Sequence, residues 1–201
     1  MPFDTRARIV SATSELFRRQ GMAGTGLKQI TKTADAPFGS LYHFFPGGKA
    51  QLAEEVIRTS GKMYFDLVMQ FFDACPDLPA GIETAFKAAA ELLVETDYAD
   101  ACPIATIALE VASTDETLRV ATADVFADWI DAGARRLADS GLPEASRRRL
   151  MIGIITSLEG AFILCRALRS TEPLEAASRT VLHAVQAELS EHFTGYAQPP
   201  G

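Results

Sequence analysis

The side chains best suited to bind a polyanion lie close together in sequence, near the start of the chain. Lysines attract phosphates, and serine and histidine donate hydrogen bonds to phosphate oxygens or to the edges of bases. An aromatic ring can contact the methyl group of thymine, and glycine lets the backbone approach a groove closely. The residues of these types are Lys28, Lys32, Phe38, Gly39, Ser40 and His43. Together they predict a contact with nucleic acid.

Chemistry of other kinds finds little support in the sequence. The three histidines, His43, His183 and His192, lie in separate segments, and the last two are spaced so that a helix would split them across its faces. We find no nucleophile elbow, phosphate-cradling glycine loop or histidine beside paired carboxylates. The sequence therefore predicts no enzyme activity, no metal site and no cofactor.

The cysteines are odd in number and far apart. Cys75, Cys102 and Cys165 have neither the spacing of metal ligands nor an arrangement that suggests a disulfide framework. We expect half-buried apolar thiols, with redox sensing as the alternative.

Charge is divided unevenly along the 201 residues, whose net charge is −7. Residues 1–50 hold seven of the 19 bases and three of the 26 acids, a balance of +4, so the rest of the chain carries −11. A basic head on an acidic body suggests that the head alone meets a polyanion.

The N-terminus and the hydropathy predict a cytoplasmic protein without a membrane segment. Asp4, Arg6 and Arg8 stand where a signal peptide needs an apolar run. We see no stretch of about 18 uncharged apolar residues.

Helical spacing of apolar residues recurs throughout, and the alternation typical of strands is missing, so the expected fold class is all-α. We expect about nine helices, each bounded by proline, glycine or a capping residue. One helix of about eight residues opens behind Thr25. The others are expected at 4–20, 39–45, 49–73, 80–95, 103–112, 115–140, 143–168 and 173–193.

The short second and third helices have the layout of a helix-turn-helix, in which the second helix of the pair enters the major groove. Leu41 and Phe45 share the inward face of the third helix, which turns Tyr42 and His43 outward. The start of the second helix, at Thr25 or Gly26, offers free N–H groups to a phosphate. We expect a DNA-binding domain at 1–48, a larger domain at 49–194 and a disordered tail at 195–201.

Residues 1 to about 58 also resemble the TetR family of bacterial repressors. The letters that match its pattern are Thr25, Ile30, Ala34, Gly39, Leu41, Tyr42, Phe45, Lys49 and Leu52. Asp35 departs from the family's glycine in a left-handed turn, and Phe44 from its usual His or Tyr. One extra glycine, with the segments "GSLYHFFPGGK" and "CPIATIALE", resembles the LmrA/YxaF-like branch.

The resemblance implies that Tyr42 and Lys49 contact phosphates. Other interpretations remain open: Tyr42 capping the small core, His43 as a solvated surface residue, and Phe44 either packing on the fourth helix or facing DNA. The family also implies an operator in double-stranded DNA, and repression as the usual outcome.

The larger domain is expected to pair two copies and to bind an effector. The helices at 143–168 and 173–193 predict the homodimer surface, because the first is apolar nearly all round. The effector, implied to be a small hydrophobic or aromatic molecule, is expected to meet Met63, Phe71, Ile107, Glu110, Phe126, Trp129, Glu159 and Phe162. A redox-responsive or ligand-independent DNA-binding regulator is the alternative.

Overall fold

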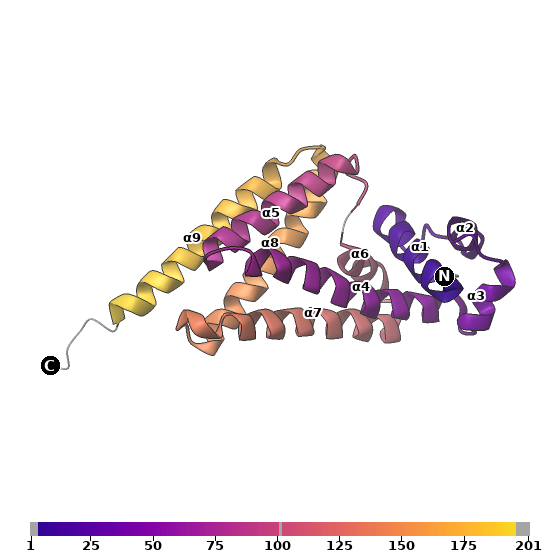
Figure 1. The fold of residues 1–201 in the computed structure, drawn as a ribbon, viewed down its shortest axis with the longest axis horizontal. Coiled ribbons are helices and arrows are strands. Elements are labelled where there is room, and N and C mark those ends of the chain that lie inside the picture. Colours follow the sequence, from indigo (N-terminus) through magenta and orange to yellow (C-terminus); the bar gives the residue numbers. More distant parts are fainter. Residues whose placement is uncertain (1–3, 101, 196–201) are drawn as a thin grey trace. The chain divides into compact units, whose positions relative to one another are not determined.

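The architecture is that of a computed structural model, which describes residues 4–100 and 102–195. Over these residues the chain forms nine α-helices and one short 3₁₀ helix, with no strand, so the all-α prediction is confirmed (Figure 1). The helices are α1 (Thr5–Gln20), α2 (Leu27–Thr33), α3 (Phe38–Phe44), α4 (Gly48–Asp73), α5 (Leu78–Glu95), α6 (Pro103–Val111), α7 (Glu116–Arg136), α8 (Glu144–Leu168) and α9 (Glu172–Gly195).

Capping residues explain where several helices begin. Asp4 accepts a hydrogen bond from the backbone N–H of Arg6 and so caps α1. Asp77 does the same for α5 through the N–H of Ala80, at 2.8 Å. Such caps satisfy backbone donors that have no partner inside the helix.

The chain divides into two compact units. Unit 1 comprises the residues up to 66 together with 99–126, and unit 2 comprises 67–98 together with the residues from 127 onward. Helices α4 and α7 have residues in both units. In this division α6 and the first part of α4 group with α1–α3, and the domain boundary expected at residue 48 stays a prediction.

Unit 1 is built around α1, which packs against α2, α3 and α6. Ile9 and Phe17 of α1, Ile30 of α2 and Leu41 of α3 are fully buried. Burying an apolar side chain of this kind stabilises the fold by about 1.5–3 kcal/mol. This packing holds α2 and α3 in place, because helices so short are not stable alone.

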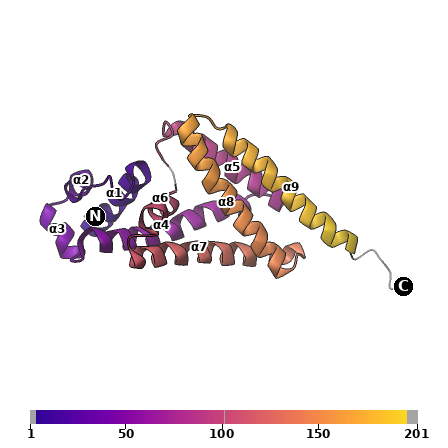
Figure 2. The same cartoon turned by 180° about the vertical axis from the view of Figure 1, so that it is seen from behind.

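Unit 2 has its core between α5, α8 and α9. Ile82 and Phe86 of α5, Cys165 of α8 and Val185 of α9 belong to this core. Helices α8 and α9 run side by side, as both views show (Figures 1 and 2).

Helix α8 leaves an apolar stripe uncovered. Ile152, Ile163, Leu164 and Leu168 are all exposed. Among the described residues it is the one helix long and apolar enough to cross a membrane, a test that helices of soluble proteins also pass. Helix α8 is thus only partly buried among the described residues, and its use as a pairing surface stays a prediction.

One predicted helix end was wrong. α7 stops at Arg136 rather than continuing to residue 140, and Ala138–Ser140 form a separate 3₁₀ turn. Gly141 follows with φ 79°, a left-handed conformation that ends the segment. The tail was expected from residue 195, but Gly195 ends α9 and the remaining positions lie outside the described residues.

Candidate nucleic-acid interface

Helix α3 shows two distinct faces, as its spacing predicted. Leu41 is fully buried and Phe45, just after the helix, is 1% exposed. Tyr42 is 49% and Phe38 44% exposed, and Gly39 and His43 are exposed as well. Four of the α3 positions predicted to meet DNA are thus exposed and the fifth, Ser40, is half-buried, while Leu41 and Phe45 hold the helix in the core.

Aromatic contacts order the exposed face of α3. Phe38 and Tyr42, one turn apart, meet edge to face with ring centroids 5.8 Å apart. His43 and Phe44 meet in the same way at 4.9 Å, and Phe44 is half-buried. Phe44 therefore supports the imidazole of His43, a contact that was not among the interpretations made from the sequence.

The turn between α2 and α3 bends at Asp35. Its φ of 48° is left-handed, the conformation for which the family's glycine is suited, and aspartate tolerates it better than most residues. The Asp35 carboxylate lies 3.6 Å from the guanidinium of Arg8 on α1. The departure from glycine is thus accommodated, and it places an acid beside one of the basic residues of α1.

The basic side chains of residues 1–50 fall into two groups that the sequence alone does not separate. Each arginine of α1 pairs with an acid: Arg6 with Glu55 at 2.9 Å, Arg8 with Asp35, Arg18 with Asp100, and Arg19 with Glu15 and Asp100. Arg6 also lies over the ring of Phe45.

The lysines of α2 and of the start of α4 have no such partners in the described part of the chain. We call α1–α3 with the start of α4 the reading head. Lys28 and Lys32 are exposed, Lys49 is half-buried, and none of them has an ion pair among the residues that the structure describes. When unpaired ammonium groups contact phosphates, they displace the counterions that are condensed on the DNA. The positive charge that remains for a polyanion is therefore carried by lysine.

The start of α2 differs in detail from the expectation. Gly26 precedes the helix and makes no side-chain cap. Thr25 is 1% exposed, and its hydroxyl donates to the carbonyl oxygen of Gly21 at 2.7 Å. A contact of Thr25 with a phosphate would consequently fall to its backbone.

The turn before α4 explains the extra glycine. Gly48 has φ 67°, which favours glycine, and the N–H of Gly47 donates to the side chain of Gln51 at 2.8 Å. Lys49 follows as the second residue of α4. The turn thereby fixes the backbone position from which the Lys49 side chain projects.

A buried polar network at the end of α1 was not foreseen from the sequence. Arg18 donates to the Tyr64 hydroxyl at 2.8 Å and lies 3.5 Å from the Asp100 carboxylate, which is 8% exposed. Burial raises the pKa of Tyr64, although its hydrogen bond to Arg18 opposes this. Burial opposes the charge of Arg18, but the Tyr64 hydrogen bond and nearby Asp100 leave its pKa raised.

The residues predicted to bind an effector are split between the two units. Met63, Ile107, Glu110 and Phe126 belong to unit 1, where Ile107 is fully buried. Phe71, Trp129, Glu159 and Phe162 belong to unit 2, and all four are half-buried. Glu110 already accepts hydrogen bonds from the backbone N–H groups of Met22 and Ala23.

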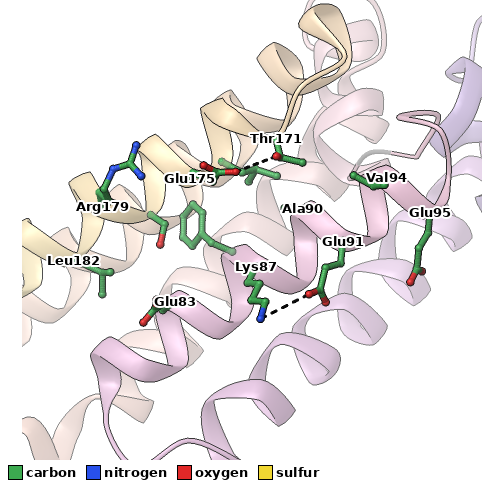
Figure 3. A pocket seen from close by; sticks show the side chains of 13 residues that line it. Glu83, Lys87, Ala90, Glu91, Val94, Glu95, Thr171, Glu175, Arg179 and Leu182 are labelled. Carbon is green, nitrogen blue, oxygen red and sulfur yellow. Dashed lines mark hydrogen bonds and ion pairs between the residues drawn. The ribbon is translucent and has the colours of Figure 1, made fainter.

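A groove of about 650 Å³ lies elsewhere, between α5 and α9 within unit 2 (Figure 3). Phe86, Ala90, Leu174 and Leu182 supply its apolar part. The charged residues of its lining are Glu83, Lys87, Glu91, Glu95, Glu175 and Arg179. None of the eight predicted effector residues lines it; the recurrence of Glu83, Phe86, Ala90 and Val94 along one helix face was the signal available in the sequence.

Two family models match the chain. The model described as "Bacterial regulatory proteins, tetR family" covers residues 9–56. The model described as "Transcriptional regulator LmrA/YxaF-like, C-terminal domain" covers residues 79–180. The first spans α1–α3 and the start of α4, which is where the unpaired lysines lie.

Individual relatives agree with these models. The chain is 36% identical to the uncharacterized HTH-type transcriptional regulator YxaF of Bacillus subtilis over 85% of this chain and 90% of that protein. It is 32% identical to the HTH-type transcriptional regulator LmrA of the same organism, over 85% and 91%. A solved structure of a regulatory protein TetR from Rhodobacter sphaeroides shares the fold, with a TM-score of 0.78 at 22% identity over 89% of this chain and 97% of that one.

Proposed function

Because this chain belongs to the TetR family of transcriptional regulators, with an LmrA/YxaF-like C-terminal domain, we propose that it represses transcription from an operator that it binds as a homodimer. It is a DNA-binding regulator and not an enzyme. Repression, release by an effector and the pairing surface are the parts that we propose. A regulator of this kind acts in the cytoplasm, where the operator lies.

The contrast between the paired arginines of α1 and the unpaired lysines of unit 1 is the structural observation that supports DNA binding. Lys28, Lys32 and Lys49 leave three positive charges free in the same unit as the exposed Tyr42 and His43. Phosphate contacts fix the register of such a head on the duplex, and base contacts from α3 then select the sequence.

The pairing surface that we propose is the uncovered stripe of α8 with the neighbouring α9. No side chain or other helix among the described residues comes within 4 Å of a Cβ added at Gly153 or Gly160 on this stripe. Two copies of the apolar stripe can cover one another. An operator with two half-sites on successive major-groove turns, about 34–36 Å apart, would then offer one half-site to the α3 of each copy.

The test of operator binding is selection from a random duplex library by the purified full chain at low ionic strength. We expect a selected site with two related half-sites in opposite orientation. A gel-shift assay on DNA flanking its own gene then asks whether that site occurs there. If no duplex is enriched over a library passed through without protein, the proposed function is wrong.

We propose further that a small hydrophobic or aromatic effector releases the protein from DNA. By linkage, an effector that lowers DNA affinity must lose affinity for the protein by the same factor when DNA is bound. Two places are candidates: the predicted residues around Trp129 and Phe71, and the α5–α9 groove, whose volume suits a small molecule. Glu83 and Glu95 on the groove have no ion pair among the described residues, so a positively charged group on the effector favours the groove.

Matched variants distinguish these places. A thermal-shift screen of aromatic compounds on the parent protein would supply the ligand, and release from the selected duplex would then be titrated. Ala90→Trp narrows the groove, and Trp129→Ala truncates the other candidate. Release that survives both changes unaltered argues against either location.

The redox alternative receives less support from the cysteines. Cys102 and Cys165 are buried, and burial raises the pKa of the Cys165 thiol, which disfavours the reactive thiolate. Cys75 is half-buried and its thiol donates to the Thr84 hydroxyl at 3.4 Å. Alkylation that leaves release from DNA unchanged would exclude a redox switch.

A further inference from the structure

The loop that joins α1 to α2 is held by a single carboxylate from far along the chain. Glu110 on α6 accepts a hydrogen bond from the N–H of Met22 through Oε1, at 3.1 Å, and from the N–H of Ala23 through Oε2, at 2.7 Å. Both N–H groups lie just past Gly21, the C-cap of α1, and so stand outside the hydrogen-bond ladder of that helix. Hydrogen bonds to an ionised acceptor are roughly twice as strong as neutral ones.

Gly21 is fitted to this arrangement in two independent ways. Its φ of 76° and ψ of 170° define a backbone region that is essentially restricted to glycine. A Cβ at this position would lie 2.0 Å from Oε1 of Glu110. The bend at Gly21 is thus what brings the two N–H groups to the carboxylate.

The same loop sets the start of α2. The Thr25 hydroxyl donates to the Gly21 carbonyl at 2.7 Å, and the Gln20 side chain donates to the Gly24 carbonyl at 2.9 Å. Only Gly26 separates Thr25 from the first residue of α2. Because α2 carries two unpaired lysines and packs against α3, a shift of this loop moves the surface that meets DNA.

A second tie reaches the end of α1 from the residue that lies shortly before α6. The Asp100 carboxylate, 8% exposed, lies 3.3 Å from Arg19 and 3.5 Å from Arg18. Helix α6 itself packs against α1 within unit 1. The stretch that contains α6 therefore holds α1 through Asp100 on one side and the α1–α2 loop through Glu110 on the other.

We propose that Glu110 is a positioning residue for DNA binding, which holds the α1–α2 loop so that α2 and α3 are presented together. Displacement of α6 that frees Met22 and Ala23 then lowers DNA affinity without any change in the residues that touch DNA. This inference rests on the proposed DNA-binding function. It assigns to Glu110, the last residue of the segment "CPIATIALE", a role in the reading head in place of one in effector binding.

The test compares Glu110→Ala and Glu110→Gln with the parent. Ala removes both acceptors, whereas Gln keeps one oxygen of similar position. Amide hydrogen exchange at Met22 and Ala23 should be fastest in Ala and intermediate in Gln. Affinity for a duplex selected by the parent should fall about tenfold in Ala and less in Gln.

Glu116→Gln is the matched control, because Glu116 is an exposed carboxylate of unit 1 that pairs only with Arg119 among the described residues. Binding is measured well below the unfolding temperature of each variant, so that a loss of stability alone leaves the affinity unchanged. A second arm adds Gly21→Ala, which should cost less affinity in the Glu110→Ala background than in the parent.

Two results would overturn the proposal. Unchanged exchange at Met22 and Ala23 in Glu110→Ala would show that the carboxylate does not hold the loop. Faster exchange with an affinity within twofold of the parent would show that the loop does not govern DNA binding. A parent that selects no duplex refutes the proposed function instead, and the exchange arm, which needs no DNA, still decides whether Glu110 holds the loop.

Discussion

At the scale of single residues, ion pairing decides which charges the molecule offers to DNA. The sequence predicted a cationic head from a count of bases, and the structure shows that Arg6, Arg8 and Arg18 are already paired. Their partners include Glu55 and Asp100, which lie outside the basic segment. A count along the chain cannot detect such pairing, because it depends on contacts between residues distant in sequence.

Lys49→Ala should weaken binding to all duplex sequences by a similar factor. A lysine that contacts a phosphate carries no sequence information, and its loss should reduce the slope of log K against log[salt] by about one. Lys62→Ala is the control, since Lys62 already pairs with Asp66 on the same helix at 3.0 Å. A salt titration with unchanged slope would remove Lys49 from the contact surface.

The raised pKa of Tyr64 predicts that the protein becomes less stable to unfolding at alkaline pH. Burial raises its pKa above the unfolded value of about 10, so folding favours the protonated phenol. Its contribution is complete below about pH 10 and is lost as the pH rises through the folded pKa. Between about pH 8 and pH 10.5, the unfolding temperature of the parent should fall more than that of Tyr64→Phe.

Tyr42→Phe is the control for this comparison, because the Tyr42 ring is 49% exposed. At neutral pH, Tyr64→Phe should itself cost about 1 kcal/mol, since Arg18 loses an acceptor. An alkaline decrease of the same size in Tyr64→Phe and in the parent would contradict the assignment.

At the scale of elements, helix positions were predictable and side-chain pairings between helices were not. The i, i+4 spacing of Leu41 and Phe45 correctly predicted which face of α3 is buried. The predicted end of α7 was wrong. The glycine that signals a helix end, Gly141, comes after a 3₁₀ turn whose composition is also typical of a helix. The contact of Glu110 with Met22 joins residues 88 positions apart, and no local pattern encodes it.

The packing of α4 against α7 within unit 1 depends on a glycine. A Cβ on Gly61 would lie 2.6 Å from Cγ1 of Val125, a β-branched side chain with little freedom to move. Gly61→Ala should therefore lower the free energy of unfolding by about 1–3 kcal/mol through overpacking. Thermal or urea unfolding measures this change.

The matched pair for Gly61→Ala is the double variant with Val125→Ala, compared with Val125→Ala alone. Removal of the valine methyl groups clears the space that the new Cβ needs, so the second alanine should then cost little. Equal costs in the two backgrounds would mean that this close approach does not matter.

At the scale of the whole molecule, the uncovered stripe of α8 predicts the oligomeric state. Gly160→Arg introduces a long charged side chain at a position where no other part of the described structure lies within 4 Å of the new Cβ. We expect helical content to stay at the parent's level while the homodimer dissociates, because a buried unpaired charge is costly. Sedimentation velocity of the two proteins at matched concentration measures the outcome.

Ala123→Arg is the control, since it adds the same side chain at an exposed position of α7. Operator affinity should fall with the loss of the dimer, because one reading head covers only one half-site. A dimeric Gly160→Arg variant, or a monomeric parent, would contradict the proposed surface.

The division between paired arginines and free lysines has a consequence for how the molecule can be silenced. Acylation of an amine abolishes its charge, whereas a guanidinium is untouched by the same reagents. Modification of Lys28, Lys32 and Lys49 would remove the charge of the surface that we propose faces the duplex, and would leave the ion pairs of α1 in place. We expect such a protein to keep its fold and to lose affinity for DNA.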